Sequence, residues 1–115
     1  ITWPSQGQTA VALLDGGEEY GLGRPYVIRC DEGYRMWYSM RTHSLGYRIG
    51  YAESADGLSW TRRDDAEGLG LSEQGWDSEM ICYAAEVDTE YGTYLFHNGN
   101  DYGRSGVGYA VLDKN

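Results

Sequence analysis

The sequence has little cysteine, proline and phenylalanine, with two, two and one of each among 115 residues. Two cysteines cannot make a disulfide framework, and we expect Cys30 and Cys82 to be buried free thiols. The scarcity of proline and the absence of polar tracts exclude a disordered chain. No apolar run approaches the roughly 18 residues that a membrane helix needs, so we expect no membrane partner.

Basic residues are also few, since nine Lys and Arg stand against 18 Asp and Glu and give a net charge of −9. A surface of this sign repels phosphate backbones, so we expect no nucleic-acid partner. The two histidines, His43 and His97, lack the spacing of metal ligands. No glycine-rich stretch carries the Lys-Ser/Thr of a phosphate loop. We therefore expect no metal and no cofactor.

Signals for export are missing as well. The N-terminus has no basic, apolar leader and no Asn-x-Ser/Thr acceptor occurs, which favours a reducing compartment such as the cytoplasm. The chain does not begin with methionine. This indicates either trimming or a piece of a longer protein.

Glycine, tyrosine and tryptophan are abundant instead, at 17, 11 and 4 residues. Many glycines among aromatic residues are typical of short strands joined by tight turns. Residues 34–40 alternate with the period of a strand, with Tyr and Met on one face and Arg, Trp and Ser on the other. The best helical candidate, residues 64–70, is interrupted by Gly68 and Gly70. The sequence therefore predicts an all-β fold.

An internal repeat organises the chain. Its motif pairs are ITW at 1–3 with LSW at 58–60 (offset 57), RMWY at 35–38 with YLFH at 94–97 (offset 59), and IGYA at 49–52 with VGYA at 107–110 (offset 58). Blades of β-propellers repeat every 40 to 50 residues or so, and long loops would account for the excess. We predict one unit over residues 1–115 that holds two four-stranded antiparallel propeller blades. Repeat one covers about 20–63 and repeat two about 76–112.

The repeats are out of phase with the chain ends. Residues 1–3 match a fourth, outer strand with no blade before it, whereas repeat two lacks its fourth strand. Two blades cannot close a ring, because known rings need about four to eight. Either several chains form a homo-oligomeric ring, each lending its first strand to a neighbour and so removing exposed edges, or the chain is a fragment of a larger propeller.

Motifs in both repeats carry a family likeness. They are GRPYV at 23–27, YRMWYS at 34–39 and YRIGYAESADGLSW at 47–60, then WDSEMICY at 76–83, LFHNG at 95–99 and GVGYA at 106–110. Over nearly all of residues 20–112 they resemble the glycosidase-type five-bladed β-propellers, the superfamily of arabinanases, fructosidases and β-mannoside phosphorylases. The resemblance implies a domain related to glycoside hydrolases and a carbohydrate ligand.

The resemblance also implies where catalysis would sit. In that superfamily the catalytic carboxylates lie at the inner ends of the innermost strands, and one blade often carries Arg-Asp-Pro there. Here Pro25 follows Arg24 directly, with no Asp between them. The next innermost strand is expected to begin at Glu79, which becomes the candidate catalytic acid. The other catalytic groups would stand on blades outside this chain.

Strand direction predicts the binding face. In an up-and-down blade, the start of the first strand and the loop between the second and third strands share one face. Guanidinium and amide groups there would bind sugar hydroxyl pairs, and aromatic rings, with Trp76 as a platform, would pack on pyranose rings. The candidate substrate-binding residues are Arg24, Arg41, His43, Tyr47, Trp76, Asn98, Asn100, Tyr102 and Arg104.

Three functions follow from these observations. The first is a glycosidase-like domain, the second a non-catalytic carbohydrate-binding module, and the third a structural or protein-interaction propeller. Turnover of glycosides that is lost in Glu79→Gln would distinguish the first. Sugar binding without turnover would indicate the second, and a protein partner without sugar affinity the third.

Overall fold

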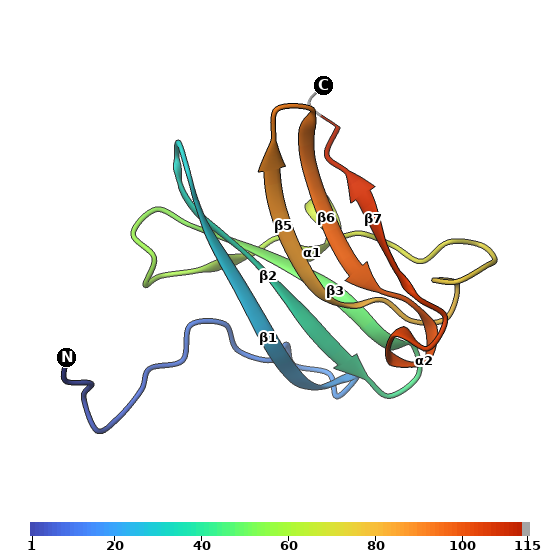
Figure 1. Ribbon diagram of the computed structural model, residues 1–115. Helices are drawn as coiled ribbons and strands as arrows, with labels where there is room; N and C mark the ends of the chain where they lie inside the picture. The colour runs from blue at the N-terminus through green and yellow to red at the C-terminus, as the bar shows by residue number, and fades with distance from the viewer. Residues whose placement is uncertain (114–115) are drawn as a thin grey trace.

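The computed structural model describes residues 1–113, with residues 66 and 67 described by their backbone alone, and it is all-β (Figure 1). Two antiparallel sheets follow one another along the chain, and neither closes on itself. The expected fold class is confirmed in this form, as sheets of four and three strands. Sheet A contains β1 (Glu19–Cys30), β2 (Gly33–Thr42), β3 (Gly46–Ser54) and β4 (Thr61–Arg62), and sheet B contains β5 (Cys82–Thr89), β6 (Gly92–Asn98) and β7 (Val107–Val111).

Helical structure is limited to two single turns, α1 (Asp64–Glu67) and α2 (Asn100–Gly103). The interruption expected at Gly68 is where α1 stops, and the Gly68 amide bonds to the Asp64 carbonyl at 2.8 Å. α2 connects β6 to β7. Among residues 1–113, no helix combines the length and the apolar composition needed to cross a membrane.

The two sheets share one register. Trp37 pairs with Tyr51 across β2 and β3, and Phe96 pairs with Tyr109 across β6 and β7. The separations of these equivalent residues, 59 and 58, are the offsets of the sequence repeat. The three strands β5, β6 and β7 therefore reproduce the pairing of β1, β2 and β3.

The sheets pack against each other through an apolar core. Trp37, Ile49 and Tyr51 of sheet A meet Ile81, Ala84 and Leu95 beside and within sheet B. Leu69 and Leu71, from the segment that joins the sheets, pack against this core. Burial of these side chains holds the sheets together, because apolar area removed from water contributes about 25 cal/mol per Å².

A paired charge lies in the same core. The Glu86 carboxylate, only 3% exposed, accepts bonds from the Arg35 guanidinium and from Trp37 Nε1 at 2.6 Å. The Tyr26 hydroxyl donates to the Glu86 carbonyl at 2.9 Å. A buried charge is tolerated when it is paired and hydrogen-bonded in this way. Glu86 thereby ties β5 to the first two strands of sheet A.

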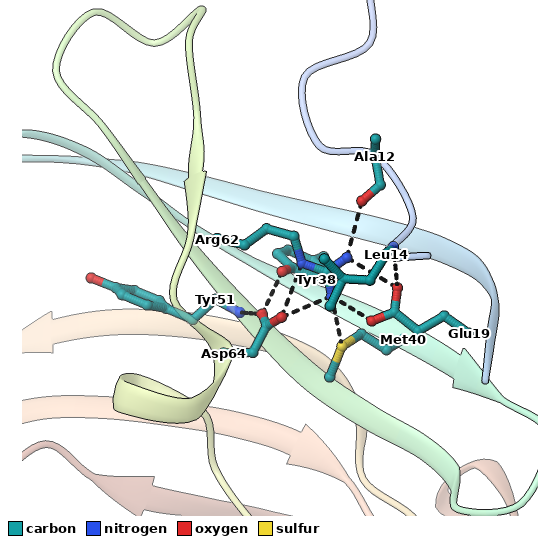
Figure 2. A network of polar contacts seen from close by, with 8 residues as sticks. All are labelled: Ala12, Leu14, Glu19, Tyr38, Met40, Tyr51, Arg62 and Asp64. Atoms are coloured by element: carbon teal, nitrogen blue, oxygen red, sulfur yellow. Dashed lines mark hydrogen bonds and ion pairs between the residues drawn. The ribbon is translucent and has the colours of Figure 1, made fainter. Parts of the chain in front are cut away.

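The opposite face of sheet A is covered by its own connecting segments. Figure 2 shows the polar network there, in which Arg62 bonds to both oxygens of Glu19 (2.6 and 3.0 Å) and to Asp64 (2.7 Å). Asp64 Oδ1 accepts the Tyr51 amide at 2.9 Å and the Tyr38 hydroxyl. Burial, with this hydrogen bond, raises the pKa of Tyr38 above its ordinary value. The network fixes β4 and α1 on sheet A.

Sheet B has one uncovered face. Phe96 and Tyr109 are 41% and 57% exposed, although their sheet A equivalents, Trp37 and Tyr51, are buried. Tyr109 is therefore not the core residue that strand periodicity suggests. Residues 1–3 lie in no strand of the single chain, and the N-terminal segment leads away from the sheets in Figure 1.

The two cysteines are free thiols in different surroundings. Cys82 is fully buried, and burial raises the pKa of its thiol to about 11. Cys30, expected to be buried, is only half-buried at the other end of its strand. Because the thiolate is the reactive form, we expect Ellman's reagent at pH 8 to modify Cys30 and spare Cys82 in the folded chain. Both thiols should react in guanidinium chloride, and two equivalents released without denaturant would contradict the placement of Cys82.

Candidate functional site

One end of the molecule, the lower edge in Figure 1, collects the starts of β1 and β5, the β2–β3 connection and α2. Matching backbone bonds form it in both sheets. The His43 amide donates to the Glu18 carbonyl at 3.0 Å, and the Asn100 amide donates to the Trp76 carbonyl at 2.7 Å. The end predicted from strand direction therefore exists as one continuous region.

Ser39 lies at the centre of this region. Its hydroxyl oxygen accepts the Tyr83 amide of sheet B at 2.9 Å, and the residue is 2% exposed. In β1, Gly23 pairs with Ser39 and is followed by Arg24. Arg41 lies two residues after Ser39 and so on the same face of β2. We call the group Arg24, Ser39, Arg41 and Tyr83 the Ser39 cluster.

The backbone of two cluster residues is strained. Pairing shifts register between Gly23 and Tyr26 in β1, and between Cys82 and Ala85 in β5. Arg24 and Tyr83 occupy these bulges in the left-handed region, with φ of 51° and 61°. Such residues cost about 1–3 kcal/mol each and concentrate at functional sites. The same strained position in both first strands marks this wall as the candidate site.

Removing the strain at Arg24 should stabilise the chain. Glycine adopts the left-handed region without steric cost, so we expect Arg24→Gly to raise the free energy of unfolding by about 1 kcal/mol. Arg29→Gly, at an exposed position of the same strand with ordinary backbone, should lower it by about 0.5–1 kcal/mol. Urea unfolding followed by circular dichroism measures both. Equal destabilisation by the two variants would show that Arg24 is not strained.

Aromatic rings surround the Ser39 cluster on the β1–β2 side. Tyr20, at the start of β1, lies 4.7 Å from the His43 ring, measured between centroids. The Arg41 guanidinium lies 5.4 Å from the centre of the Tyr20 ring. Arg41 and His43 were predicted here, whereas Tyr20 was not. Its position at the start of a first strand was the signal that could have identified it.

Tyr47 continues the aromatic surface towards sheet B. Its ring lies 5.0 Å from that of Tyr102 and 6.2 Å from that of Tyr83, both edge to face. Burial and the neighbouring Cys82 raise the pKa of Tyr83, and the nearby Tyr47 raises that of Tyr102. All of these phenols are protonated at neutral pH, so they can donate and accept bonds with sugar hydroxyls. Tyr47 and Tyr102 were predicted, and Tyr83 was missed.

Other predicted residues have structural partners. Asn100 Oδ1 accepts the Glu79 and Met80 amides at 2.7 and 3.1 Å, and Asn98 Nδ2 donates to the Tyr102 carbonyl at 3.1 Å. Arg104 contacts Asp101 at 3.5 Å on the surface. These contacts shape the β6–β7 connection.

Trp76 does not stand free as a sugar platform. Its ring stacks on His97 at 5.1 Å with an interplanar angle of 22°. A Cβ added at Gly99 or Gly108 would lie 2.4 or 2.3 Å from the Trp76 ring, so the ring rests on these two glycines. The aromatic residue expected to bind ligand therefore packs on sheet B.

Glu79 lies outside the innermost strand, because β5 begins at Cys82 and not at Glu79. Its side chain is exposed, while its backbone is held by Asn100 and by Arg48, which donates to the Glu79 carbonyl at 3.4 Å. Other acids at this end are engaged, Glu18 with the Ser44 hydroxyl and Glu19 with Arg62. Glu79 as a catalytic acid stays a prediction. Within residues 1–113, no group of three or more His, Cys, Asp or Glu is placed to hold a metal ion.

Comparison with solved structures decides the type of fold. A protein described as "Glycoside hydrolase" superposes with a TM-score of 0.65 at 17% identity, over 82% of this chain and 28% of that one. The fold is glycosidase-like. A second solved structure, described as a complex of BT0996 and RGII, gives a TM-score of 0.60 at 16% identity, over 82% of this chain and 27% of that one.

Sequence comparison gives longer relatives of unassigned function. The chain is 36% identical over 113 residues to "Uncharacterized protein Rv1502" of Mycobacterium tuberculosis strain H37Rv, and 35% identical to "Uncharacterized protein MT1551" of strain CDC 1551. Each alignment covers 98% of this chain and 37% of the relative. The chain thus spans about 37% of the length of these curated relatives. No family model matches it.

Proposed function

We propose that this chain is part of a glycosidase-like β-propeller and binds carbohydrate at the Ser39 cluster and the tyrosines around it. The observation that carries the proposal is the concentration of left-handed Arg24 and Tyr83, Arg41 and exposed Tyr102 at one end of a glycosidase-like fold. Phenol and guanidinium groups bind hydroxyl pairs, and tyrosine rings pack on the apolar faces of pyranoses.

Binding is the part of this function that the described residues support. Hydrolysis of a glycosidic bond needs two carboxyl groups about 5–5.5 Å or about 6.5–9.5 Å apart. At this end Glu79 is exposed and the side chain of Asp77 is buried, with Oδ1 lacking a hydrogen-bond partner. Neither stands in the Ser39 cluster. A second carboxylate would come from sheets beyond those of this chain.

Calorimetric titration with a panel of oligosaccharides tests the proposal. We expect at least one saccharide to bind and Tyr102→Ala to weaken its binding about tenfold, since one lost stacking and hydrogen-bonding contact is worth about 1.4 kcal/mol. Tyr91→Ala is the matched control, because Tyr91 is also exposed and lies in the β5–β6 turn at the other end of sheet B. Failure of every saccharide, or equal loss in both variants, would contradict the proposal.

The uncovered face of sheet B supports assembly with a further sheet. Phe96 and Tyr109 occupy the positions through which Trp37 and Tyr51 attach sheet A to sheet B. A second copy of the chain, or a following sheet of a longer protein, would cover them by the same packing. We expect the isolated chain to self-associate in sedimentation as its concentration rises, and Phe96→Arg to abolish this. A monomer at all concentrations would exclude the homo-oligomer.

A further inference from the structure

The basic residues of this acidic chain are divided in an informative way. Four arginines, at positions 35, 62, 63 and 104, pair with carboxylates within residues 1–113. Arg24 and Arg41 form no ion pair with a described carboxylate, although the whole chain carries a net charge of −9. Both belong to the Ser39 cluster. Two exposed guanidinium groups thus lie unpaired at the candidate site of a chain with twice as many acids as bases.

The Arg41 guanidinium is held in place without a carboxylate. A Cβ added at Gly21 would lie 2.6 Å from both Nε and Nη2 of Arg41, so the guanidinium rests directly on the β1 backbone at this glycine. The Tyr20 ring borders it at 5.4 Å. A planar cation fixed in this way loses little conformational entropy when it binds a planar anion.

We propose that the saccharide bound at the Ser39 cluster is acidic, with the carboxylate of a hexuronic acid residue received by Arg41 and Arg24. This inference rests on the proposed carbohydrate function and names the class of sugar. Guanidinium groups bind carboxylates through two parallel charge-assisted hydrogen bonds, which are about twice as strong as bonds between neutral groups. The hydroxyls of Tyr83 and Tyr102 then bind the ring hydroxyls of the same sugar.

The surrounding charge makes the site selective. The net charge of −9 repels an anion everywhere except where cations are unpaired. An acidic saccharide therefore gains affinity at Arg24 and Arg41, and a neutral saccharide gains none from their charge. Because both groups are exposed, screening by salt should reduce the gain, since the Debye length is only about 8 Å at 0.15 M.

The test compares a hexuronic acid trisaccharide with its carboxyl-reduced, neutral counterpart by calorimetric titration of the whole chain. We expect the acidic trisaccharide to bind about tenfold more tightly, and the difference to shrink as salt is raised from about 20 to about 500 mM, a range that spans the physiological Debye length of roughly 8 Å. Arg41→Gln and Arg24→Gln should each reduce the difference at least threefold. Arg29→Gln, at the far end of β1, should preserve it. Gly21→Ala should also reduce it, because it displaces the Arg41 guanidinium and leaves the charge intact.

The outcomes separate this inference from the function on which it rests. Equal affinity for the two trisaccharides would overturn the acidic specificity and leave carbohydrate binding standing. Competition by inorganic phosphate as strong as that of the acidic trisaccharide would also overturn it, since the site would then bind any oxyanion. Binding of neither trisaccharide would overturn the inference. Failure of the whole saccharide panel as well would overturn carbohydrate binding.

Discussion

Trp37→Ala should lower the free energy of unfolding by about 3–5 kcal/mol, whereas Phe96→Ala, at the equivalent position of sheet B, should lower it by about 1 kcal/mol. The two aromatic residues share a register, but Trp37 is 8% exposed and Phe96 is 41% exposed. Deleting the buried ring leaves a cavity and an unbonded Glu86 carboxylate oxygen. Deleting the exposed ring loses only partial burial.

Urea unfolding at low protein concentration measures this contrast. Raising the concentration should increase the cost of Phe96→Ala alone, because self-association would bury the uncovered face. Equal costs at low concentration would show that the two sheets do not pack through the Trp37 face, or that something within the chain already covers Phe96.

Glu86→Ala should be nearly as destabilising, at about 3–5 kcal/mol, because removing one partner of a buried pair leaves the other charge without compensation. Here the cation left behind is Arg35, and Trp37 Nε1 loses its acceptor. Glu90→Ala, at an exposed turn position of sheet B, should change the free energy by no more than about 0.5 kcal/mol.

A double variant separates pairing from packing at this position. Arg35→Met combined with Glu86→Leu replaces both charges by apolar groups, which is often neutral or stabilising for a buried pair. We expect the double variant to recover most of the stability that Glu86→Ala loses. If it is no more stable than Glu86→Ala, the carboxylate has a role other than partnering Arg35.

The repeat was readable from the sequence because strand pairing preserves it. Residues 35–38 and 94–97 fall in matched registers, so a similarity of letters became a similarity of sheets. Period-two alternation also placed Trp37 and Ser39 on one face, and both point to sheet B. The resemblance to glycosidase-type propellers anticipated the glycosidase-like fold, while the five-bladed ring remains a proposal.

The site was less readable, for physical reasons. Left-handed backbone usually announces itself as glycine, and here Arg24 and Tyr83 adopt it, held by the bulges of β1 and β5. The Arg35–Glu86 pair joins residues 51 apart, and no local pattern encodes such a partner. Trp76 appeared to be a platform because the two glycines on which it rests lie more than 20 residues further along the chain.

The claim that carbohydrate binds around Ser39 is tested most directly by titrating the ¹⁵N-labelled chain with the tightest-binding saccharide and recording amide shifts. We expect the largest changes at Arg24, Arg41, Tyr83 and Tyr102, with Tyr91 at the other end of sheet B unchanged. Shifts confined to the uncovered face of sheet B or to the far end of the sheets, with none around Ser39, would contradict it.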